Sequence, residues 1–181
     1  MYKNYLYWYI KMTTNPYDQI ADFLFLGNRH ALTYANNFSL IVNCSREKDV
    51  AFPPNHMNCI RLSVEDSSDE AAKLLSLILE TKVLENIHNN IIRKQPVLVH
   101  CSAGMQRSCA TVACYLIKYH SMDPSTAVEY IRSKRPIAFF WTVNFAKTIE
   151  DFYTRLQDVN KLYKIEATIE AYNESSCAFL K

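Results

Sequence analysis

Short apolar runs alternate along this chain with longer segments in which apolar residues recur at helical spacing. The short runs predict strands at residues 20–26, 39–43 and 58–64. A continuous apolar run from Pro96 to His100 predicts another strand, and its lack of alternation is typical of a strand covered on both faces of a parallel sheet. We expect this strand at the centre of the fold.

The segments between these runs predict helices. One helix is expected from about Ser68 to about Asn89, behind a Ser-x-x-Glu pair that matches a capping box. A second is expected over residues 109–117, a third begins at Asp123 with proline in its first turn, and a last one covers residues 149–156. Alternating strands and helices predict an α/β fold with a central, mostly parallel sheet flanked by helices on both faces.

The 181 residues are predicted to form one domain with a short extension at each end. Residues 18–165 are expected to be the folded domain, and residues 166–181, where the periodicity weakens, a partly loose tail. Residues 1–17 predict an aromatic helix or arm whose uncharged run is too short to cross a membrane. Its apolar stripe would pack on its own domain or support a homodimer, and consists of Tyr2, Tyr5, Leu6, Tyr9 and Ile10.

Charge and cysteine content narrow the classes of function. A net charge of +2 with dispersed Lys and Arg does not favour a nucleic-acid partner. The six cysteines show no CxxC pair and no zinc-ligand spacing, and no secretory signal precedes them. We therefore expect reduced thiols in a cytoplasmic or nuclear compartment.

The connection from Cys101 to Arg107 lies where open α/β sheets bind their ligands, between the end of a strand and the start of a helix. Amide groups at a helix N-terminus favour an anion, and Gly104 allows the loop to turn its N–H groups inward. The same field lowers the pKa of a cysteine thiol, and an arginine side chain can hold two phosphoryl oxygens. These residue types predict a thiolate nucleophile with a phosphate clamp.

The block HCSAGMQRS, residues 100–108, resembles the HCxxGxxRS signature of the protein-tyrosine-phosphatase superfamily. Three other segments resemble the compact dual-specificity phosphatases: ADFLFLGNRHAL, LIVNCSRE and AVEYIRSKRP with the following Asn144–Phe145 pair. The resemblance covers about residues 18–156. It implies a shallow pocket, phosphorylated proteins as substrates at tyrosine, serine and threonine, and no metal or cofactor.

The resemblance also implies roles for individual residues. Cys101 would be the nucleophile, Arg107 the phosphate clamp and Asp66 the general acid, with Asp69 and Glu65 as weaker candidates for the acid. His100 would orient the nucleophile and support its low pKa, and Ser108 would donate a hydrogen bond to the thiolate. The substrate phosphate would be bound by the loop residues Ser102, Ala103, Gly104, Met105, Gln106 and Arg107.

Three other functions remain open on the same fold. A phosphoinositide phosphatase would be expected to carry lysines in the loop, where this chain has Met105 and Gln106. An RNA 5′-phosphatase would show a second histidine and an asparagine there. A non-catalytic phosphoprotein-binding module would keep the fold and lose turnover.

The composition, with only two glycines, and the compact form resemble the small viral members of the family, which would place the protein in an infected host cell or a virion. Cys44 and Cys109 are candidates for a reversible disulfide with Cys101 that would protect the nucleophile from over-oxidation.

Overall fold

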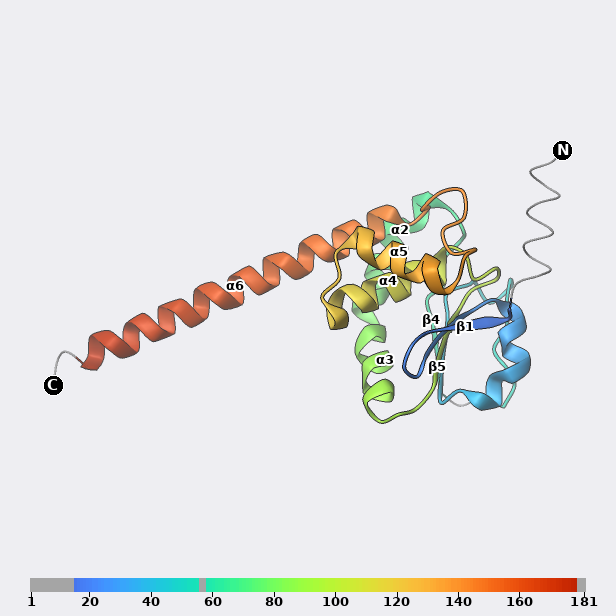
Figure 1. Cartoon of the computed structure of the whole chain (residues 1–181), viewed down its shortest axis with the longest axis horizontal. Coiled ribbons are helices and arrows are strands. Elements are labelled where there is room, and N and C mark those ends of the chain that lie inside the picture. The colour runs from blue at the N-terminus through green and yellow to red at the C-terminus, as the bar shows by residue number, and fades with distance from the viewer. Residues whose placement is uncertain (1–14, 56–57, 179–181) are drawn as a thin grey trace.

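The computed structural model describes residues 15–55 and 58–178, which form a five-stranded sheet with helices packed on it and one long helix that projects from the body (Figure 1). The strand order is β1-β2-β5-β3-β4, and every neighbouring pair is parallel except β1 and β2. The predicted α/β class is therefore confirmed. The strands are β1 (Tyr17–Ala21), β2 (Leu24–Gly27), β3 (Leu40–Asn43), β4 (Cys59–Arg61) and β5 (Val97–His100).

Strand β5 lies at the centre of the sheet, as its continuous apolar sequence predicts. All four of its residues are buried, because it is paired on both edges and covered on both faces. Val97 and Val99 face the larger core, which contains residues of helices α2 to α6. Leu98 faces a smaller core on the other side, formed with the 3₁₀ helix η1 (Arg29–Asn37).

The run at residues 20–26, predicted as one strand, is a hairpin. β1 and β2 pair in antiparallel fashion, and the chain reverses at Asp22 and Phe23. Phe23 has φ of 60°, a left-handed conformation that phenylalanine seldom adopts. The prediction was wrong because neither glycine nor proline marks this turn, so the apolar run continues through it.

The single helix predicted over residues 68–89 is divided into three pieces. A short η2 (Ser68–Glu70) leads into α2 (Ala71–Glu80), and α3 (Val83–Ile92) follows after a break. At the break Lys82 has φ of 49°. A lysine in the left-handed region leaves no signal in the hydrophobic pattern, which explains the error.

Three helices complete the domain: α4 (Arg107–His120), α5 (Pro124–Lys134) and α6 (Ala146–Ala178). The predicted cap of α5 is present, since Asp123 Oδ1 accepts the N–H of Thr126 at 3.0 Å. Helix α6 extends to Ala178, into the segment predicted as a tail, and the predicted domain limits stay a prediction. The N-terminal stripe lies outside the described residues. Within residues 15–55 and 58–178, none of the helices has both the length and the apolar content needed to cross a bilayer.

Candidate active site

The loop of residues 101–106 lies at the carboxyl edge of the three central strands. The Cys101 N–H donates to the Gly27 carbonyl at the end of β2, and the Cys44 N–H at the end of β3 donates to the His100 carbonyl at 2.8 Å. These bonds hold the loop between β5 and the first turn of α4. The sequence therefore builds the site at the place where parallel sheets bind ligands.

The Cys101 thiol is fully buried and receives hydrogen bonds from two sides. The Gly104 N–H lies 3.2 Å from its sulfur, and the Ser108 hydroxyl donates to the same sulfur at 3.3 Å. The family resemblance implied the Ser108 contact, and Gly104 was expected to let the loop turn its N–H groups inward. Together the two hydrogen bonds fix the sulfur at the floor of the loop and stabilise its anionic form.

Opposing effects act on the pKa of Cys101. Burial raises the pKa, and the Asp66 carboxylate acts in the same direction. The positive charge of Arg107, with hydrogen bonds from the Ser108 hydroxyl and backbone N–H, outweighs them and leaves the pKa below the ordinary value of a cysteine thiol. Cys101 is thereby favoured as a thiolate nucleophile.

Arg107 connects the loop to the segment that carries the candidate acid. Its Nη1 donates to the Val64 carbonyl at 3.2 Å, and its Nη2 lies 3.4 Å from Asp66 Oδ2. The guanidinium is only 4% exposed and its Nε has no hydrogen-bond partner among the described residues, whereas the Asp66 side chain is 37% exposed. Asp66 is thus brought to the mouth of the loop with an accessible carboxylate.

Glu65 and Asp69, the two weaker candidates for the acid, do not contact Arg107. Glu65 forms an ion pair with Arg46, which also pairs with Asp49 at 2.9 Å. Asp69 is in the first turn of η2 and donates its N–H to the Ser67 hydroxyl. The structure therefore brings only Asp66, of these three carboxylates, to Arg107.

His100 is buried directly before Cys101. Burial lowers the pKa of its imidazole to about 4, although an interaction with the Cys101 backbone opposes this effect. Neither ring nitrogen has a hydrogen-bond partner of good geometry among the described residues. His100 is therefore uncharged at neutral pH, which fits a positioning role better than that of a base.

Gly104 has φ of 67°, as the loop requires. A Cβ at this position would lie 2.5 Å from the Gly27 carbonyl oxygen and 2.7 Å from Arg135 Nη2. Only glycine can bring its N–H to Cys101 while the backbone passes this close to β2.

Arg135, which sequence reasoning did not single out, supports the loop through a buried hydrogen bond to its backbone. Its side chain is 1% exposed, donates from Nε to the Gly104 carbonyl at 2.9 Å and pairs with Asp18 at 2.5 Å. The only signal in the sequence is an arginine beside a proline at the end of a helix.

Gln106 was expected among the phosphate-binding residues, but its side chain points elsewhere. Its Nε2 donates to the Thr142 carbonyl at 2.7 Å, and its Oε1 accepts the Asn144 N–H at 3.1 Å. The Met105 carbonyl accepts the Phe139 N–H in the same region. The side-chain amide of Gln106 is thus engaged elsewhere, and only its backbone is available to bind a phosphate.

The two other thiols near the site are buried. Cys44 lies 3.5 Å from the Thr111 hydroxyl, and Cys109 donates to the Gly104 carbonyl at 3.5 Å. Burial raises the pKa of both, to about 12 for Cys44, and each is close enough to Cys101 for electrostatic interaction. Cys44, Cys59, Cys101, Cys109 and Cys114 are free thiols in the structure, and the protective disulfide stays a prediction.

Comparison with known protein families identifies the family of this chain. Residues 3–155 match the model of the dual specificity phosphatase catalytic domain. This chain belongs to that family. The resemblance drawn from the loop and its flanking segments is confirmed, and the chain is a phosphatase of the cysteine-based type.

Individual relatives of this phosphatase domain agree with the family. A candidate tyrosine phosphatase, 123R, of Invertebrate iridescent virus 6 is 29% identical over 80% of this chain and 97% of the viral protein. Dual specificity protein phosphatase 21 of Homo sapiens is 33% identical over 67% of this chain and 64% of the human protein. The crystal structure of human DUSP28 superposes with a TM-score of 0.69 at 24% identity, covering 80% of this chain and 97% of that one, which shows the shared fold.

Proposed function

We propose that this chain is a protein phosphatase that hydrolyses phosphotyrosine and phosphoserine or phosphothreonine through a cysteinyl-phosphate intermediate. The observation that carries the proposal is the buried Cys101 sulfur, which accepts hydrogen bonds from Gly104 and Ser108 and has its pKa lowered by Arg107. Membership of the family supports phosphatase chemistry. The substrate class and the role of each residue are part of the proposal.

In the first step the Cys101 thiolate attacks phosphorus. An S–P bond forms, the ester P–O bond breaks, and Asp66 gives its proton to the leaving oxygen. The Arg107 guanidinium binds two of the phosphoryl oxygens, while backbone N–H groups of the loop, among them that of Gly104, balance the remaining charge. Asp66 is suited to this role because its exposed carboxylate lies 3.4 Å from Arg107, at the mouth of the loop.

In the second step a water molecule attacks the phosphorus of the intermediate. An O–P bond forms, the S–P bond breaks, and Asp66 takes the proton of the water. Ser108, whose hydroxyl lies 3.3 Å from the sulfur, stabilises the thiolate as it leaves. Inorganic phosphate and free enzyme are the products.

The compartment also belongs to the proposal. The relative from an iridescent virus supports a reducing compartment, the cytosol or nucleus of an infected host cell. Phosphorylated proteins are the partners that this proposal requires.

Phosphate release from one peptide that carries both phosphothreonine and phosphotyrosine tests the proposed substrate class. With metal ions chelated and each site followed by mass spectrometry, we expect loss of phosphate at both sites. Loss at neither site, with an aryl phosphate still hydrolysed, would contradict the substrate class. Phosphoinositide vesicles and a 5′-triphosphorylated RNA, tested in parallel, would then identify which alternative applies.

Asp66→Asn tests the assignment of the acid. Serine and threonine alkoxides are poor leaving groups that need a proton, so the rate on phosphothreonine should fall by about 10²-fold. An activated aryl phosphate needs little protonation, and its rate should fall by less than about 10-fold. Asp69→Asn is the matched control and should leave both rates unchanged. Equal losses of Asp66→Asn on the two substrates would assign Asp66 a structural role.

A further inference from the structure

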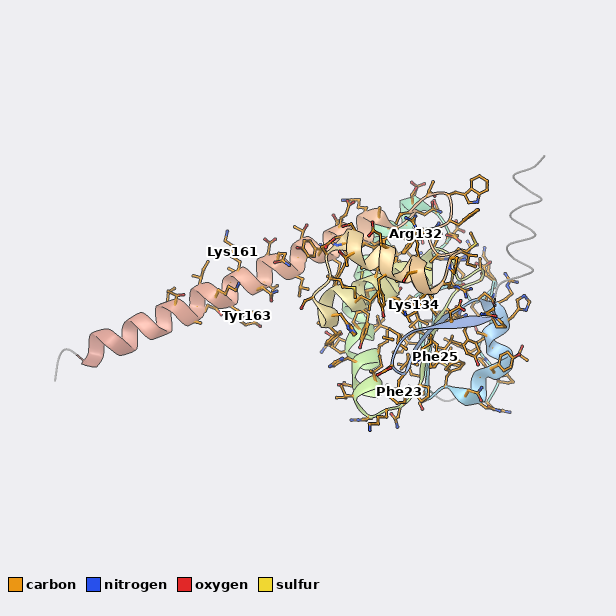
Figure 2. All side chains as sticks on the ribbon, viewed as in Figure 1. Phe23, Phe25, Arg132, Lys134, Lys161 and Tyr163 are labelled. Atoms are coloured by element: carbon orange, nitrogen blue, oxygen red, sulfur yellow. The ribbon has the colours of Figure 1, made fainter. Side chains whose placement is uncertain are left out.

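The second half of α6 extends beyond the domain without covering it (Figure 1). Every residue from 157 to 169 is exposed. Figure 2 shows Lys161 and Tyr163 on opposite sides of this projecting segment. Large apolar side chains are nevertheless frequent in it, with exposed fractions of 46% for Val159, 61% for Leu162, 66% for Tyr163, 46% for Ile165 and 55% for Ile169.

Three apolar residues of the projecting segment, Leu162, Ile165 and Ile169, lie on a different side of the helix from the residues that pack on the domain. Ile149 and Phe152 are buried in the core, and Leu156 packs against it. Leu162, Ile165 and Ile169 follow at spacings of three and four residues, and a helix of 3.6 residues per turn places this second stripe well around the axis from the first. The domain therefore cannot cover it.

A helix of this kind gains most of its stability from packing of its apolar face. No ion pair is present between the described side chains of residues 157–169 that would support the segment internally. A stripe with spacings of three and four is also the pattern that packs helix against helix in a coiled coil, with Leu162 and Ile169 at a positions and Ile165 at d.

We propose that this stripe, Leu162, Ile165 and Ile169, is a self-association surface on which further copies of this chain pack their α6 helices in parallel and in register. The charges beside the stripe identify the occupant as a second copy. With Leu162 at a, Lys161 occupies the preceding g position and Glu166 the following e position. In a parallel coiled coil a g residue faces the e residue five positions later on the neighbouring chain, so Lys161 meets the partner copy's glutamate at 166.

The opposite orientation does not give this match. In an antiparallel pair, g positions face g positions and e positions face e positions, so Lys161 and Glu166 would not meet. Leucine at a with isoleucine at d favours more than two strands, and we therefore expect trimers or tetramers as well as dimers.

A membrane surface fits the segment less well. Residues 157–169 carry Asp158, Lys161, Lys164 and Glu166, so their formal charges cancel. An amphipathic helix that binds anionic lipid normally has a basic polar face, which is absent here.

The test is the molar mass of the full chain in solution, measured by light scattering over a range of protein concentrations. The monomer mass is 21.0 kDa, and the wild-type protein should exceed it increasingly as the concentration rises. Leu162→Lys with Ile165→Lys should stay at the monomer mass. Tyr163→Lys, at an exposed residue outside the stripe, is the matched control and should associate as the wild type does.

Exchange of the charges tests the orientation. Lys161→Glu alone should weaken association by about three-fold or more, because two glutamates then face each other across the interface. Adding Glu166→Lys in the same chain should restore it. Hydrolysis of an aryl phosphate, equal in all variants, shows that the domain remains folded. A wild-type protein that stays monomeric, with or without binding to anionic vesicles, overturns the proposal. The proposal is also overturned if Lys161→Glu with Glu166→Lys associates as weakly as Lys161→Glu alone.

Discussion

Replacement of Cys101 by serine should abolish turnover, with a loss on the order of 10⁵-fold. The thiol is fully buried, and its lowered pKa depends on Arg107 and Ser108, which stabilise an anion. A serine hydroxyl in the same place has no comparable tendency to ionise and is a far weaker nucleophile. The rate of phosphate release from a phosphotyrosine peptide measures the loss.

The Cys101→Ser variant should still bind that peptide, because Arg107 and the N–H groups of the loop remain in place. Its melting temperature should change by only a few degrees, since the two side chains have similar volumes. Cys59→Ser is a suitable control, because Cys59 is a partly buried residue of β4 whose pKa is raised by burial. If Cys101→Ser retained more than about a hundredth of the wild-type rate, Cys101 would not be the nucleophile.

Arg107→Lys should cost about 10³-fold in kcat/KM, although the charge is kept. One guanidinium here donates to the Val64 carbonyl, approaches Asp66 and has a further nitrogen, Nε, without a partner among the described residues. A lysine ammonium can neither hold two phosphoryl oxygens in one plane nor connect the loop to the acid. Steady-state kinetics on phosphopeptide and aryl phosphate measure this loss.

The matched control for this substitution is Arg132→Lys. Arg132 donates to the Phe139 carbonyl at 2.9 Å, and its hydrogen bonds do not reach the loop of residues 101–106. Its conservative replacement should change kcat/KM by no more than a few-fold. Similar losses for the two variants would mean that positive charge, and not the geometry of Arg107, accounts for the effect.

Much of the site could be predicted because its chemistry is local in sequence. Cys101, Gly104, Arg107 and Ser108 lie within eight residues, so a strand-loop-helix motif is enough to bring them together. Asp66 is 35 positions from Cys101, since 101 − 66 = 35, and only the family pattern indicated its place. The structure brings it within 3.4 Å of Arg107.

The supporting contacts could not be predicted because they join segments that no local pattern relates. Arg135 contacts Gly104 and Asp18 of strand β1, and Gln106 connects the loop to residues 140–144. The hydrophobic pattern also failed at Phe23 and Lys82. Both residues have left-handed backbone conformations, and neither residue type indicates a turn.

During turnover the phosphoryl group should pass through Cys101. Mass spectrometry of the wild-type protein, quenched in acid during turnover of an aryl phosphate and digested, tests this step. We expect a phosphoryl group on the peptide that contains Cys101, and none on that peptide from Cys101→Ser. A wild-type protein that releases phosphate steadily while this peptide stays unmodified, or carries the group on another residue, would contradict it.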